Sequence, residues 1–149
     1  MWMLVRSNAL GRNELHGQQR VLAACPDTGE RGDPWRWTVA VRHEPHGTVA
    51  TVETDGDFLA SSELILNGGE SCSLTRASGE VLVATVLVGQ ARIASVTGPW
   101  ERWIRPDDVF VLEGEDDEDI RISLAGAQAR ASVFRLTPNN AAGALRWVP

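Results

Sequence analysis

The stretch "GGESCSLTRASGEVLVATVLVG", residues 68–89, contains two expected strands joined by a turn. Residues 71–76 alternate polar and apolar side chains, a period of two that is typical of a β-strand. The turn "ASGE", residues 77–80, contains the glycine that such a reversal favours. Residues 80–88 are apolar on both faces, which predicts a central strand that is buried on both sides.

Short runs of the same kind cover most of the chain, and turn signals such as "EPHG", "NGG" and "RPDD" separate them. No segment keeps a helical period beyond about one turn, except "AAGALRW" at residues 141–147. Strands are expected at residues 18–24, 35–43, 48–54, 62–66, 71–76, 80–88, 91–96, 101–105, 108–113, 120–125 and 129–136. This pattern predicts one all-β domain over residues 1–149, a jelly-roll barrel or β-sandwich.

Composition and charge limit the kinds of partner and the cellular location that we expect for this protein. The chain has 149 residues, is 43% hydrophobic and carries a formal net charge of -6. The charge argues against nucleic acid and against an anionic membrane as partners. The longest apolar run, residues 81–89, is far shorter than the roughly 20 residues of a membrane helix. With two cysteines, Cys25 and Cys72, and no disulfide framework, we expect a cytoplasmic protein.

Faces can be assigned on the strand expected at residues 35–43. Trp35, Trp37, Val39 and Val41 fall on one side, which we expect to be the core. Arginines and smaller residues, Arg36 and Arg42 among them, fall on the opposite side.

Residues 69–89 resemble the first motif of the cupins, small jelly-roll proteins in which two glycines bracket a strand-turn-strand unit. Gly69 and Gly89 occupy the two glycine positions, and "PDDVFVLEGEDDEDI", residues 106–120, is similar in outline to the second cupin motif. The resemblance places the usual metal ligands at Thr75, Ala77, Leu82 and Glu118. Because the first three cannot hold a transition metal in the usual way, we expect no metal and no cofactor.

A second resemblance is to the HutD/Ves family of cupin-fold proteins. It rests on "PWRWTVAV" (34–41), "VLVATVLVGQARI" (81–93), "DVFVLEG" (108–114) and "ARASVFRLTP" (129–138), which follow the order of that family. It implies a regulatory or small-ligand-binding role.

Two clusters of polar residues have an ordinary explanation. His43 and His46 flank Pro45, which disfavours a helix there, and no further metal ligands are apparent, so we interpret them as turn residues. The acids of "EGEDDEDI", residues 113–120, lack the spacing of an EF-hand and are typical of a solvated loop.

The arginines expected on strands suggest a ligand. Arg36 and Arg42 share a face, and Arg121, Arg130 and Arg135 alternate on the last two strands. A guanidinium that points into a barrel would bind a small organic acid, because it pairs bidentately with carboxylates. The candidate ligand-binding residues are Arg36, Arg42, Thr75, Trp103 and Arg121.

Three functions follow from this pattern. The first is a metal-free cupin-fold protein that acts as a small-ligand-binding or regulatory module. The second is a metal-independent enzyme of the isomerase or epimerase type, with acid and base groups in the lumen. The third is a structural domain that forms a homodimer through an edge strand. An inward-facing His or carboxylate would favour the enzyme, whereas a lumen filled with apolar side chains would favour the structural domain.

Overall fold

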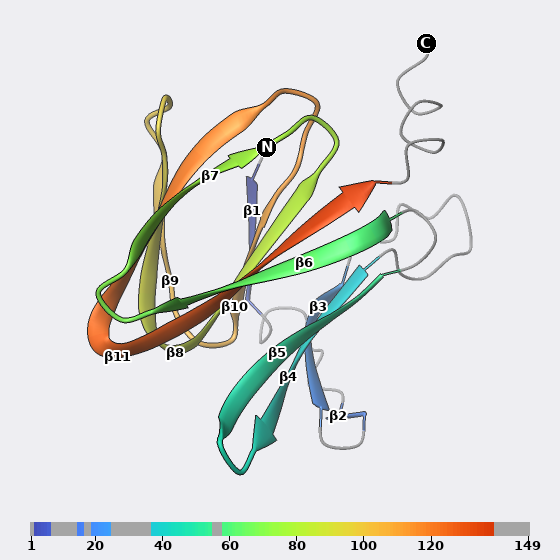
Figure 1. Cartoon of the computed structure of the whole chain (residues 1–149), viewed down its shortest axis with the longest axis vertical. Coiled ribbons are helices and arrows are strands. Elements are labelled where there is room, and N and C mark those ends of the chain that lie inside the picture. The colour runs from blue at the N-terminus through green and yellow to red at the C-terminus, as the bar shows by residue number, and fades with distance from the viewer. Residues whose placement is uncertain (1, 7–14, 17–18, 25–36, 55–57, 139–149) are drawn as a thin grey trace.

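The computed structural model describes residues 2–6, 15–16, 19–24, 37–54 and 58–138. Every element in these ranges is a β-strand, which confirms the prediction of an all-β protein (Figure 1). Within them, no helix is long and apolar enough to cross a membrane. The helical segment expected at residues 141–147 lies outside the described residues.

The strands form two sheets (Figure 1). The larger sheet contains β1 (Trp2–Arg6), β6 (Phe58–Asn67), β7 (Ser71–Arg76), β8 (Val81–Ser95), β9 (Glu101–Ile104), β10 (Asp108–Leu112) and β11 (Glu118–Pro138). Its path runs β1-β10-β8-β11-β6, with β7 also paired to β11 and β9 to β8. The smaller sheet contains, in order, β2 (Leu15–His16), β3 (Gln19–Ala24), β4 (Trp37–Glu44) and β5 (Gly47–Thr54).

Two strands, β8 and β11, are longer than the sequence predicted. The expected ranges merge in pairs, 80–88 with 91–96 and 120–125 with 129–136. Gly89 and Gly126 lie inside the merged strands with φ of 79° and 101°. The prediction of separate strands was wrong because these glycines bend the strand instead of ending it. The β8–β11 register shifts between Ala125 and Arg130, and pairing continues beyond.

The bends let the large sheet fold over on itself and enclose an inner core. This core contains Leu66, Leu82, Ala84, Val86, Ala91, Ile93, Ile104, Phe110, Leu112, Ile120, Ile122, Leu124, Ala129, Ala131 and Val133. Cys72, Leu74 and Trp100 pack against it, and the rings of Trp100 and Phe110 are 5.7 Å apart. Apolar side chains of the described residues therefore fill this interior, as expected for the structural alternative, and a ligand site among these residues would have to lie outside it.

A second, intersheet core joins the outer face of the large sheet to the small sheet. It contains Leu22, Trp37, Val39, Val41, Ala50, Val81, Val83, Val109, Val111, Phe134 and Leu136. Val81 and Val83 of β8 face this core, whereas Leu82 and Ala84 face the inner core. The prediction that this strand is buried on both sides is confirmed, since all residues from 81 to 86 are buried.

The expected face of β4 is confirmed for Trp37, Val39 and Val41, which are all buried in the intersheet core. Trp35 and Arg36 lie outside the described residues. The sequence did not predict β1, a five-residue strand that pairs antiparallel with β10 at one side of the large sheet.

Candidate functional site

The positions at which the cupin motif would carry metal ligands lie in different surroundings. Thr75 is exposed on β7, where its Oγ1 donates a hydrogen bond to Oδ1 of Asp119 at 2.5 Å. Ala77 lies exposed in the turn after β7, and Leu82 is buried in the inner core. Across the described ranges, no three His, Cys, Asp or Glu side chains are grouped so that they could hold a metal ion. These positions do not form one site.

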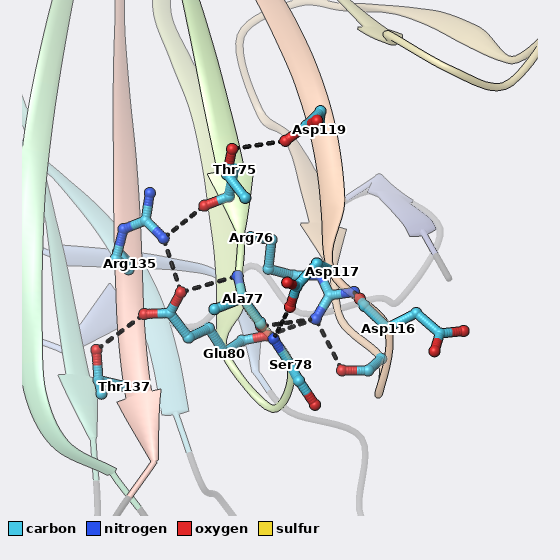
Figure 2. Close-up of polar contacts among 11 residues, drawn as sticks. Thr75, Arg76, Ala77, Ser78, Glu80, Asp116, Asp117, Asp119, Arg135 and Thr137 are labelled. Carbon is cyan, nitrogen blue, oxygen red and sulfur yellow. Dashed lines mark hydrogen bonds and ion pairs between the residues drawn. The ribbon is translucent and has the colours of Figure 1, made fainter.

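A buried arginine organises the turn between β7 and β8 instead. Arg76 is 1% exposed. Its Nη1 donates to the carbonyl oxygens of Ala77 at 3.1 Å, Glu80 at 3.4 Å and Gly114 at 2.7 Å. Its Nη2 donates to the carbonyl oxygen of Asp116. The guanidinium thus fastens the acidic loop after β10 to the β7–β8 turn (Figure 2).

The acids of that loop reach back to the same turn. Oδ1 of Asp117 accepts the amide hydrogen of Ser78 at 2.8 Å. Oε2 of Glu118 lies 3.8 Å from Nη2 of Arg76. The acidic loop after β10, which the sequence predicted to be solvated, therefore also holds the β7–β8 turn in place (Figure 2).

Next to the acidic loop, several polar side chains link β7, β8 and β11. Nη1 of Arg135 donates to the carbonyl oxygen of Thr75 at 2.8 Å and to Oε1 of Glu80 at 2.8 Å. Oγ1 of Thr137 donates to Oε2 of the same glutamate at 3.3 Å. Figure 2 shows these side chains converging on Glu80. Arg135 is consequently engaged within the protein.

Three predicted ligand-binding residues, Thr75, Trp103 and Arg121, share one exposed face of the large sheet. Arg121 is in register with Ser73, two positions from Thr75 along β7. Trp103 is in register with Arg92 and is 51% exposed. The structure brings the three onto one face, which is the outer one, and none of them lines either hollow described below.

Another predicted residue, Arg42, lies in the small sheet. It forms an ion pair with Glu44 on the same strand. Nearby, Nδ1 of His43 lies 2.8 Å from Oγ1 of Thr48. Arg36, its expected neighbour, is outside the described residues. Arg42 and the outer-face residues therefore belong to different sheets.

The structure contains a further site, which the candidate residues did not include. A groove of about 400 Å³ lies between the β4–β5 turn, the end of β6 and the bends of β8 and β11. We call it the Arg130 groove. Its lining consists of His46, Gly47, Thr48, Asn67, Gly68, Val88, Ala127, Gln128, Ala129 and Arg130.

Arg130 is the charged centre of this groove. The side chain is half-buried, and its Nη2 donates to the carbonyl oxygen of Thr48. Its Nε is buried without a hydrogen-bond partner among the described residues, as are the Nε atoms of Arg42 and Arg76, so the contrast with those two arginines lies in the groove and its lining. A guanidinium carries five N–H donors, so this one has donors to spare. The lining includes no Asp or Glu, although the chain has 20 acids and only 14 arginines and lysines.

Small residues bring the bent strands together beside Arg130. A Cβ atom on Gly89 would lie 2.7 Å from the Cβ of Ala129. A Cβ on Gly68 would collide with the carbonyl oxygens of Gly126 and Ala127. The glycines and alanines around residue 126 are the sequence signal for this close approach, but their spacing alone does not indicate where Arg130 lies.

A second hollow, of about 320 Å³, lies further along β5 and β6. We call it the Glu63 hollow. It is lined by Ala50, Thr51, Val52, Ser61, Ser62, Glu63 and Phe134. Oε1 of Glu63 accepts a hydrogen bond from Oγ of Ser132 at 3.1 Å. The two hollows thus differ in charge, one with an arginine and one with a glutamate.

No protein family and no curated protein matches this sequence. The chain is, however, similar in structure to solved cupin-type proteins. A cupin 2 domain-containing protein from Halorhodospira halophila is 12% identical, with a TM-score of 0.44 over 100% of this chain and 97% of that one. The Cnp3 cupin domain of Schizosaccharomyces pombe is 11% identical, with a TM-score of 0.43 over 87% and 68%.

A de novo designed double-stranded β-helix is similar to a smaller part of the chain. It is 15% identical, with a TM-score of 0.43 over 52% of this chain and 97% of the design. These likenesses concern the path of the strands, and they extend to no ligand, partner or reaction.

Proposed function

We propose that this protein is a non-catalytic module that binds a small organic acid in the Arg130 groove. The observation that carries the proposal is a half-buried guanidinium with unused donors in a groove whose lining holds no acid. The resemblance to HutD/Ves proteins in the order of the strands supports a binding or regulatory role.

A carboxylate suits this groove for two reasons. Guanidinium donors match the two oxygens of a carboxylate, and partial removal from water strengthens that pairing. In a protein of net charge -6, an anion is repelled from most of the surface, so a patch without acids is favoured for its approach. His46 and the amides of Asn67 and Gln128 supply further polar groups at the rim.

The enzymatic alternative has less support. Among the described residues, the buried polar or charged side chains are Arg76, Thr85, Asp108 and Ser132. Arg76 is held by carbonyl groups, and Oδ2 of Asp108 accepts the amide hydrogen of Arg105 at 3.2 Å. Within the described ranges, an acid or base acting on a substrate would have to come from the rim of a groove, as His46 does.

The test is a titration of the purified protein with acetate, lactate, succinate and benzoate, followed by thermal unfolding and calorimetry. At least one acid should raise the midpoint of unfolding, and its neutral amide should not. Arg130→Gln, which keeps a polar amide and removes the charge, should weaken that binding about tenfold or more.

Two arginines serve as matched controls. Arg42→Gln removes an arginine that already has Glu44 as partner, and Arg121→Gln removes one from the outer face. Both variants should bind like the unmodified protein. If no acid binds, or if the three variants lose binding equally, the proposal is wrong.

A further inference from the structure

The two hollows lie along one seam between β5 and β6. Thr48 and Asn67 line the Arg130 groove, whereas Val52 and Glu63 line the Glu63 hollow. In the described part of the chain, β5 pairs with β4 only, and β6 pairs with β11 only. Figure 1 shows β5 and β6 diverging along their length.

The backbone edges of the strands border this seam. Ala50, Thr51 and Val52 are consecutive, and so are the residues at positions 61–63 that line the same hollow. A strand presents alternate residues to each face, so consecutive lining residues indicate that the edge itself is exposed to the hollow. An edge with unpaired N–H and C=O groups is a template for a further strand.

The outward direction of the β5 backbone is fixed by Arg130. Its hydrogen bond shows that the carbonyl of Thr48 points away from β4 and into the groove. In an antiparallel ladder, alternate residues point their N–H and C=O groups the same way. Ala50 and Val52 therefore also present their backbone groups to the seam.

We infer that the natural ligand of the Arg130 groove is the carboxyl-terminal segment of an extended peptide, which pairs antiparallel with β5. This inference rests on the proposed function, because the terminal carboxylate is the acid that Arg130 binds. It adds the class of molecule that carries the acid.

The direction of β5 determines the direction of the peptide. β5 runs from the Arg130 groove toward the Glu63 hollow, since Gly47 lines the first and Val52 the second. An antiparallel partner therefore starts near Glu63 and ends at Arg130, which places its carboxylate on the guanidinium. The opposite end would meet the carboxylate of Glu63, which favours a basic residue or an amino group there.

An apolar contact lies between the two charged ends. Ile65 is 52% exposed and lies between Glu63 and Asn67 on the same side of β6. The strand covers about 13 Å between these two residues at about 3.3 Å per residue. A segment of four to six extended residues therefore fits, with one apolar side chain against Ile65. Addition of a strand to an open edge, together with capture of a terminal carboxylate, is a known mode of peptide recognition.

The experiment uses an acetylated hexapeptide pool, random at each position, in two forms: with a free terminal carboxylate and with a terminal amide. After equilibration with the full chain, retained peptides are identified by ultrafiltration and mass spectrometry. We expect the carboxylate form to be retained at least fivefold more than the amide form, with an apolar residue enriched at one or two positions.

Two variants and one chemical control test the geometry. Arg130→Gln should lose the preference for the carboxylate, and Ile65→Ser, an exposed change, should lose the apolar enrichment. A selected peptide that is N-methylated at alternate amides should bind in one methylation pattern and fail in the other. Equal binding of both patterns would overturn strand pairing.

The outcomes separate this inference from the proposed function. If small acids bind and no peptide is retained, the peptide inference is wrong and the proposed function stands. If neither binds, both are wrong. If light scattering shows a dimer that protects the alternate amides of β5 from exchange, a second copy is the occupant, and the peptide inference is overturned.

Discussion

Arg76 is buried and Arg130 is half-buried, and these two arginines differ in how many acceptors surround them. Arg76 donates to four backbone carbonyl oxygens and lies near Glu118. Arg130 donates to one, the carbonyl of Thr48. The comparison teaches that burial of a cation does not by itself indicate a site. The number of acceptors that the fold supplies decides whether a cation stabilises the fold or is available to a ligand.

The largest effect is expected at Arg76. Arg76→Met should lower the free energy of unfolding by about 3–5 kcal/mol, because several carbonyl groups lose their donor at once. Urea unfolding of purified protein measures this. Arg130→Met should lower the free energy of unfolding by only about 1 kcal/mol, because one carbonyl group loses its donor. Equal losses in the two variants would remove the distinction between the two arginines.

A smaller effect is expected at the bend that positions Arg130. Gly89→Ala should cost about 2–4 kcal/mol, because it combines a left-handed backbone with a collision against Ala129. Gly69→Ala is the matched control. It has a φ of 81°, but a Cβ there would meet nothing within 4 Å, so only the backbone cost of about 1–2 kcal/mol applies.

The difference between these two glycine variants isolates the close approach of β8 to β11. Gly89→Ala should also weaken the binding of any acid that Arg130 holds, while Gly69→Ala should not. Calorimetry on both variants checks this. Similar stability and similar binding for the two would show that the close approach does not position Arg130.

The smallest effect on stability is expected for an arginine that is exposed to solvent. Arg92 and Glu101 form an exposed ion pair on β8 and β9. The hydrogen bond from Arg92 lowers the pKa of Glu101 below its usual value. The pair therefore contributes stability above the unfolded pKa of that glutamate, and the contribution is lost as pH falls through the lower, folded value.

Glu101→Gln should remove this contribution and flatten the pH dependence of the unfolding midpoint between about pH 5 and pH 3. Because the pair is exposed, salt should reduce the difference between the variant and the unmodified protein. Thermal unfolding across that pH range, at low and high salt, provides the measurement. A strong effect that persists at high salt would contradict the assignment of this pair as a surface contact.

The strands could be predicted from the sequence because alternation and apolar runs report burial directly. Residues 71–76 match β7, and the doubly buried run after them is the first half of β8. The continuity of β8 and β11 could not be predicted, because a glycine with positive φ can end a strand or bend it. The residues that determine whether the strand ends or bends, such as Ala129 opposite Gly89, are distant in the sequence.

The sequence predicted the chemistry of the candidate site, an arginine that binds a carboxylate, but not which arginine forms it. The alternation of Arg121, Arg130 and Arg135 indicated a carboxylate partner, but it gave no way to choose among them. The register shifts on both sides of Arg130 break the alternation along β11, so that Arg121 lies on the outer face, Arg130 in the groove and Arg135 against Glu80. A shift of register is a property of paired strands, so the pattern of one strand does not contain it.

The shared long strands have a consequence for how the protein comes apart. β8 and β11 pair with each other on both sides of their bends, and each half of the large sheet depends on the same two strands. Opening one half would release strands on which the other half also depends. We therefore expect native-state hydrogen exchange to report a single cooperative unit for β8, β10 and β11. Folding should be slow for the size of the chain, because the pairing that both halves require joins residues far apart in the sequence.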